Sequence, residues 1–99
     1  MNNTISDWAV CVEDTFDIKF VGKCNTGRVL YGFPDAGDLA TFYDSAEEKW
    51  KRLMVLGVEK VCIGGPPHMG DNVGILLPER VPKGGCIIGM KKERVMKDE

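Results

Sequence analysis

Three runs with the two-residue period of β-strands lie in the first third of the chain, at residues 8–13, 17–21 and 28–33. Residues 17–21 alternate polar and apolar side chains, whereas in 8–13 Trp8, Val10 and Val12 share one face and Ala9 and Cys11 the other, so both faces of that strand can be covered. Residues 23–27, between the last two runs, end in Asn-Thr-Gly, and asparagine and glycine favour a short loop with left-handed backbone angles. We therefore predict three strands in this region, of which the second and third form a hairpin.

The segment 39–43 can be interpreted in two ways. It follows the turn signal Pro-Asp-Ala-Gly-Asp at residues 34–38 and contains threonine, phenylalanine and tyrosine, which favour a strand. A helix that begins at Asp38 would also include these residues, in its first turn. We expect a fourth strand, and the length of the segment leaves the helical alternative open.

The segment 45–57 has the features of an amphipathic helix. Ser45 and Glu48 match a capping box, in which each side chain accepts a backbone N–H of the first turn. Glu47 and Lys51 lie four residues apart, in the order that favours an ion pair on a helix surface. The apolar stripe and the C-terminal cap consist of Ala46, Trp50, Leu53, Leu56 and Gly57. We therefore predict one main helix over residues 45–57.

Three apolar segments after this helix, 59–64, 73–77 and 86–90, indicate further strands. The fold class is therefore predicted as α+β, with about seven mostly antiparallel strands and one main helix, in a single domain over residues 1–99. Its charged tail, 91–99, either frays or extends the last strand. One helix covers only one face of such a sheet. The other face must be covered by curling of the sheet into a partial barrel, or by a second copy of the chain.

Composition and charge narrow the function. The 99 residues carry 13 basic and 15 acidic side chains, a net charge of −2, which gives no general attraction for nucleic acid. The longest apolar runs are far shorter than the ~18 residues of a membrane span. The first residues lack the basic and apolar regions of a secretion signal. We therefore expect a cytoplasmic protein that binds neither nucleic acid nor membrane.

The cysteines predict free thiols. Cys11, Cys24, Cys62 and Cys86 form no Cys-x-x-Cys pair, and the chain has one histidine, His68. Zinc sites need clustered cysteine and histidine ligands, so we expect neither a metal nor a cofactor. A cysteine activated by His68 would make a small Cys/His enzyme. Each cysteine also fits a purely structural position, so we assign no catalytic residue.

The segment 64–72 is the most unusual in the chain and the candidate ligand site. Its sequence, Gly-Gly-Pro-Pro-His-Met-Gly-Asp-Asn, follows an apolar strand and contains three glycines. Glycines let successive backbone N–H groups converge on an anion, and Arg28 and Tyr31 on a predicted strand supply a cation and a ring. The candidate ligand-binding residues are Gly64, Gly65, His68, Gly70, Asp71, Asn72, Arg28 and Tyr31.

Three hypotheses follow for the function. The first is a small cytoplasmic, non-catalytic binding or regulatory module for a small anionic or nucleotide-like ligand, which assembles into a homo-oligomer. The alternative is a protein–protein interaction module, an inhibitor or accessory subunit that uses an open sheet face or edge. The third is the small Cys/His enzyme, which we rank last because no catalytic set is assembled in the sequence.

Overall fold

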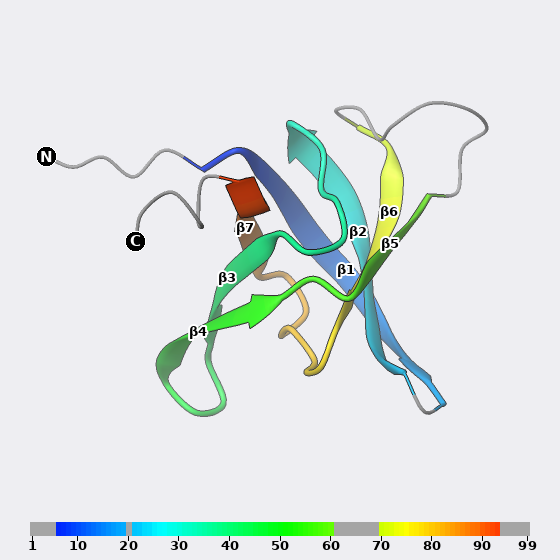
Figure 1. Cartoon of the computed structure of the whole chain (residues 1–99). Helices are drawn as coiled ribbons and strands as arrows, with labels where there is room; N and C mark the ends of the chain where they lie inside the picture. Colours follow the sequence, from blue (N-terminus) through cyan, green and yellow to red (C-terminus); the bar gives the residue numbers. More distant parts are fainter. Residues whose placement is uncertain (1–5, 20, 61–69, 94–99) are drawn as a thin grey trace, which may run out of the picture.

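Seven β-strands account for most of the residues that the structure describes (Figure 1). This computed structural model describes residues 6–19, 21–60 and 70–93. The strands are β1 (Trp8–Ile18), β2 (Gly22–Tyr31), β3 (Leu39–Asp44), β4 (Lys49–Met54), β5 (Gly57–Lys60), β6 (Asn72–Leu77) and β7 (Cys86–Met90). They form one antiparallel sheet in the order β4-β3-β7-β1-β2-β6-β5. Within the described ranges, no helix is long and apolar enough to cross a membrane.

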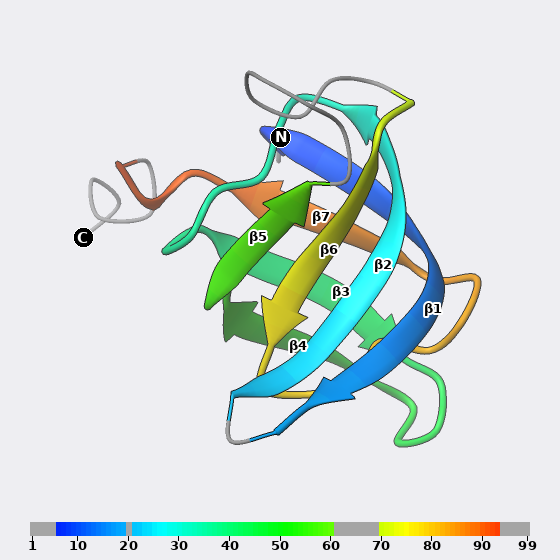
Figure 2. The same ribbon diagram turned by 90° about the vertical axis from the view of Figure 1, so that its right-hand side faces the viewer.

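The sheet curls until its two edge strands, β4 and β5, meet at one corner (Figures 1 and 2). Only Val55 and Leu56 separate these strands in the chain. The Val55 N–H donates to the carbonyl of Asp38, next to β3, at 2.8 Å. The Leu56 N–H donates to the carbonyl of Leu76 on β6, also at 2.8 Å. The segment between β4 and β5 therefore bonds to the residue before β3 on one side and to β6 on the other, and it closes the curl at this corner.

The inside of the curled sheet holds the apolar core. Alternate side chains of the strands point inward, so the alternation in the sequence becomes the core. The fully buried apolar residues are Trp8, Val10, Val12, Val29, Ala40, Phe42, Val55, Val73, Ile75, Leu77, Val81 and Ile87. Trp8, the largest of them, donates from its indole Nε1 to Asp38 Oδ2 at 2.9 Å, which satisfies the one polar atom of the ring.

The predicted main helix over residues 45–57 is wrong, and so is the α+β class, because the described chain is nearly all β. Residues 45–48 form a turn between β3 and β4, and Gly57, the predicted helix cap, begins β5. β3 and β4 form a regular hairpin that pairs Asp44 with Lys49 next to the turn. The sheet is therefore covered by its own curl and not by a helix.

The local signals for that helix are used by the hairpin instead. Asp44, and not Ser45, accepts the turn N–H groups: its Oδ1 accepts from Ala46 at 2.9 Å and from Glu47 at 3.3 Å. Such side chain to backbone bonds compete with helix formation. Glu47 and Lys51 form an ion pair at 3.3 Å, but around the turn of the hairpin. The four-residue spacing of Glu47 and Lys51 thus suits a helix and a hairpin equally. The pairing of residues 49–54 with β3 decides for the hairpin.

Two further predictions at the start of the chain are corrected. The run at 8–13 and the first two residues of the run at 17–21 belong to one long strand, β1, whose pairing with β2 shifts register twice, as at β-bulges. Lys19 and Val21 lie in the turn after it. β1 and β2 do form a hairpin, but its turn follows Ile18, and the predicted loop residues Asn25 and Gly27 lie within β2. A glycine is needed there because a Cβ on Gly27 would collide with the backbone of β1.

The structure tests some of the remaining secondary-structure predictions. The segment 39–43 is strand, in β3, so the helical alternative does not hold. The predicted strands at 73–77 and 86–90 correspond to β6 and β7. Part of the predicted strand at 59–64 and residues 94–99 of the predicted tail lie outside the described ranges.

Candidate functional site

The predicted ligand site falls only partly within the structure. Gly64, Gly65 and His68 lie outside the described residues, as does the cysteine at position 62. Gly70 and Asp71 lead directly into β6, where they bond to β2: the Gly70 N–H donates to the Val29 carbonyl at 2.7 Å and the Val29 N–H to the Asp71 carbonyl at 3.0 Å.

Arg28 lies beside this segment, as the sequence hypothesis requires. Arg28 and Asn72 are partners in the β2–β6 ladder, and the Arg28 Nη1 donates to the Gly70 carbonyl at 3.4 Å. The same guanidinium is paired, however, with Glu13, since Nε lies 3.5 Å from Glu13 Oε2. Tyr31 lies at the end of β2, where its hydroxyl shares a hydrogen bond with Ser6. The structure therefore brings Arg28 to Gly70 and Asn72, while Tyr31 contacts a different segment.

A hollow of about 530 Å³ lies on the outer surface next to Asn72. It forms where the strands carry small residues, and its charged lining residues are Glu13, Glu59 and Lys60. Two carboxylates and one amine give no net attraction for an anion. The described part of the predicted site therefore adds no support for a small anionic ligand, which stays a prediction.

Sequence reasoning did not single out the outer surface of β4, β3 and β7, which is apolar and exposed. We define the outer patch as Leu39, Tyr43, Trp50, Arg52, Met54, Ile88 and Met90, outward-pointing residues of these strands. Trp50 is 64% exposed and Met54 60%. The rings of Tyr43 and Trp50, partners in the ladder, pack edge to face with centroids 5.5 Å apart. Large exposed rings that hold one another in place are typical of interaction surfaces.

The outer patch contains a groove with one cation. The groove has a volume of about 290 Å³ and is lined by Ser6, Leu39, Thr41, Arg52, Ile88, Gly89 and Met90. Among the described residues, the Arg52 side chain has no hydrogen bond or ion pair with another side chain or backbone group. Tryptophan, tyrosine and arginine are the residues most enriched in the energetic centres of protein interfaces. The patch therefore combines the residue types that such centres use.

The backbone beside the outer patch is also open. β4 is the end strand of the sheet and has β3 as its neighbour on one side only. Val55 is hydrogen-bonded to Asp38, and hydrogen-bonded pairs alternate along an antiparallel ladder. The backbone N–H and C=O groups of Trp50, Arg52 and Met54 therefore point away from β3, toward the free side of β4. These are the residues whose side chains form the outer patch.

A signal for this surface was present in the sequence. In the segment Lys-Trp-Lys-Arg-Leu-Met of β4, the outward residues Trp50, Arg52 and Met54 alternate with the inward residues Lys51 and Leu53. The inward Lys51 lies between Trp50 and Arg52, so polarity does not alternate with the strand period, and the segment was assigned to the helical period instead. Only the partner of Lys51 in the fold makes the strand interpretation clear.

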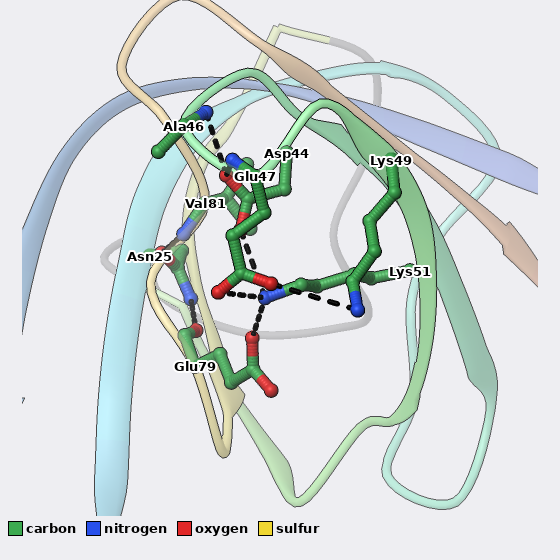
Figure 3. Close-up of polar contacts among 8 residues, drawn as sticks. All are labelled: Asn25, Asp44, Ala46, Glu47, Lys49, Lys51, Glu79 and Val81. Atoms are coloured by element: carbon green, nitrogen blue, oxygen red, sulfur yellow. Dashed lines mark hydrogen bonds and ion pairs between the residues drawn. The ribbon is translucent and has the colours of Figure 1, made fainter.

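Lys51 points to the inside, where three carboxylates surround it (Figure 3). Its Nζ lies 2.8 Å from Asp44, 2.6 Å from Glu79 and 3.3 Å from Glu47. These bonds link the β3–β4 hairpin to the connection between β6 and β7. They raise the pKa of Lys51, with the bond to Asp44 as the largest cause. The amine stays protonated at neutral pH and cannot act as a nucleophile, so we assign this cluster a structural role.

The cluster predicts a pH-dependent stability. The bond from Lys51 lowers the pKa of Asp44, so this carboxylate stabilises the fold above its ordinary pKa of about 3.9 and loses that contribution as the pH falls. We expect Lys51→Met to lower the unfolding temperature most at neutral pH, and progressively less as the pH falls below the ordinary pKa of Asp44, because protonation of that carboxylate removes its attraction to Lys51. Thermal unfolding followed by circular dichroism measures both. Lys49→Met, which removes an exposed lysine of the same strand, is the control. A deficit in Lys51→Met that does not depend on pH would contradict this role.

Within the described ranges, no group of three or more histidine, cysteine, aspartate or glutamate side chains is placed so that it could hold a metal ion. Comparison with known sequences does not assign the chain to a group: it matches no protein family, and none of the curated proteins has a similar sequence.

Proposed function

We propose that this chain is a protein–protein interaction module that binds an extended segment of a partner protein along the free side of β4. The partner segment adds a strand to the sheet, places apolar side chains on the outer patch, and carries a carboxylate that pairs with Arg52. The observation that carries the proposal is the coincidence on β4 of an open backbone edge, exposed aromatic and apolar side chains, and Arg52, which pairs with no other described residue.

Strand addition supplies affinity through the backbone and specificity through side chains. Trp50, Arg52 and Met54 offer both, because their N–H and C=O groups point to the free side while their side chains lie on the outer patch. An added strand runs at about 4.8 Å from β4, so its outward side chains would lie next to Trp50 and Met54. Burial of apolar surface stabilises such a complex by ~25 cal/mol per Å² before the cost of ordering the segment.

Charge favours a heterologous acidic partner over a second copy of the chain. β4 contains Lys49, Lys51 and Arg52 and no acidic residue. Antiparallel pairing of two β4 strands around Arg52 would place the two guanidinium groups directly opposite, and like charges in that position are destabilising. Within the described part of the chain, no carboxylate pairs with Arg52 as Asp44 pairs with Lys51. A partner carboxylate would satisfy it.

The proposal can be tested with random peptides displayed on phage, selected against the purified full chain. We expect the selected peptides to alternate apolar residues and to contain an aspartate or glutamate. A synthetic copy of a selected peptide should slow the hydrogen exchange of the backbone N–H groups of Trp50, Arg52 and Met54, which its strand would cover. Trp50→Ala should weaken its binding by at least about tenfold, the size of a central interface contact.

Matched variants distinguish binding at this interface from nonspecific binding to any exposed apolar side chain. Phe16→Ala removes another ring that is more than half exposed, on β1, three strands from β4, and should leave the affinity unchanged. Arg52→Glu should change the preference of the selected peptides from acidic to basic. Selection of no peptide, or equal losses in Trp50→Ala and Phe16→Ala, would reject the proposal. Concentration-dependent dimers that Trp50→Ala abolishes would instead identify a second copy as the occupant.

The cellular setting that we propose is the cytoplasm. The three cysteines that the structure describes are free thiols, and thiols stay reduced in that compartment.

A further inference from the structure

Cys11 on β1 and Cys86 on β7 lie directly opposite each other in the β1–β7 ladder. Their neighbours Val10 and Ile87 point into the core, so both cysteine side chains point to the outer surface. Cys86 is exposed and Cys11 is half-buried, and both are free thiols. The fold thus places two thiols, 75 positions apart in the chain, side by side on one face.

The neighbouring hydrogen bonds define the geometry of this pair. The Val12 N–H donates to the Gly85 carbonyl at 2.9 Å, and the Gly84 N–H donates to the Val12 carbonyl at 2.9 Å. Because the two kinds of pair alternate, Cys11 and Cys86 form a non-hydrogen-bonded pair, whose Cα atoms lie about 4.5 Å apart. Disulfides span Cα separations of roughly 4.4–6.8 Å. The two sulfurs can therefore be joined with little backbone movement.

The surroundings of Cys86 affect its reactivity. Partial burial, followed by the thiol of Cys11 beside it, raises the pKa of Cys86. Since the thiolate is the reactive form, Cys86 reacts more slowly at neutral pH than an ordinary thiol. This behaviour suits a pair that is reduced by default and becomes oxidised only when an oxidant is abundant.

We propose that Cys11 and Cys86 form a reversible disulfide across β1 and β7 in the presence of a low-molecular-weight disulfide such as oxidised glutathione. The Cys86 thiolate attacks one sulfur of the oxidant and expels one glutathione thiolate. The Cys11 thiolate then attacks Sγ of Cys86 and expels the second. Two protein thiols are oxidised to one disulfide, the oxidant is reduced to two thiols, and the protons of Cys11 and Cys86 end on the two expelled thiolates.

Cys24 provides an internal comparison. It is buried, and its ladder partners on either side, Phe16 and Leu76, carry no thiol. Burial, and then the charge of Glu59, raises the pKa of Cys24. We therefore expect Cys24 to remain reduced under conditions that oxidise the pair.

The test uses the reduced full chain, incubated with oxidised glutathione, blocked with N-ethylmaleimide and mapped by mass spectrometry without reduction. We expect the peptides of Cys11 and Cys86 to be linked, with the loss of two hydrogen atoms, while Cys24 carries the blocking group. Reduced glutathione should reverse the link. At pH values below the thiol pKa, the rate of disulfide formation should rise about tenfold for each unit of increase in pH, because the thiolate fraction rises by the same factor.

Three variants make the outcome decisive. Cys11→Ser should accumulate a stable glutathione adduct on Cys86, because the resolving thiol is missing. Cys86→Ser should react more slowly, since Cys11 is less exposed. The double variant Cys24→Ser with Cys62→Ser should form the Cys11–Cys86 link at the wild-type rate. A wild-type protein that keeps a glutathione adduct on Cys86, links other cysteines, or does not react would overturn the proposal.

Discussion

Replacing Gly89 with alanine is expected to destabilise the fold by more than about 3 kcal/mol, a large part of the total stability of a small domain. Gly89 lies in β7 directly opposite Trp8, and a Cβ at this position would fall inside the indole ring. The ring cannot move aside cheaply, because it is fully buried and its Nε1 is bonded to Asp38. Denaturant unfolding followed by tryptophan fluorescence measures the loss.

Two comparisons test the cause of that effect. Gly57→Ala adds the same methyl group where nothing lies within 4 Å, so its stability should stay within about 0.5 kcal/mol of the wild type. Combining Gly89→Ala with Trp8→Leu should cost less than the sum of the two single changes, because the smaller side chain leaves room for the new methyl group. Full additivity of the two changes would show that contact with Trp8 is not the reason.

Replacing Asn25 with leucine is expected to cost about 3 kcal/mol or more, although the two side chains have similar volumes. Asn25 is fully buried, and its Oδ1 accepts from the Val81 N–H at 2.8 Å and from Thr15 Oγ1 at 2.9 Å. Its Nδ2 lies 3.3 Å from the carbonyl oxygens of Lys23, Ile75 and Glu79. Leucine would remove the partner of the buried Val81 N–H and of the other groups, which are buried or partly buried, and each buried group left unsatisfied costs about 1–3 kcal/mol.

The amide also holds the connection between β6 and β7 against β2, next to the Lys51 cluster (Figure 3). The exchange rate of the Val81 N–H should therefore rise sharply in Asn25→Leu, since Asn25 is its bonding partner. Thr15→Val, which removes one donor to the same amide, is the matched control and should cost about 1 kcal/mol. Equal effects of the two substitutions would argue against a central role for Asn25.

The strands of this fold could be predicted where inward and outward residues differ in polarity. The alternation at Trp8, Val10 and Val12 is local, and it corresponds to the buried face of β1. Predictions failed where a residue type that is common in turns also has a role within a strand. Asn25 and Gly27 are common in turns, but here one binds a distant loop through its amide and the other gives room for β1.

The helix prediction failed for a related reason. Glu47 and Lys51 match a helical ion pair and also a hairpin ion pair, so their spacing carries no information about the choice. The decisive contacts of Lys51 are with Asp44 and Glu79. Glu79 lies 28 positions away in the chain, and a pattern read in a window of a dozen residues does not include it.

The candidate interaction surface depends on the tertiary structure even more. Trp50 and Met54 on β4 gather with Ile88 on β7 only because β3 lies between these two strands. The free side of β4 is likewise a property of the strand order. The thiol pair of Cys11 and Cys86 arises in the same way, from one register across two strands.

The amino-acid sequence by itself therefore determined where many of the strands lie, because alternation along a strand is set by neighbouring residues. It also determined the low net charge of these 99 residues. The tertiary structure alone decided that residues 49–54 are a strand, that the sheet closes on itself at Val55, and which side chains meet on its outer surface. Those outcomes depend on hydrogen bonds and contacts between residues that are distant in the chain, and local preferences are too weak to set them.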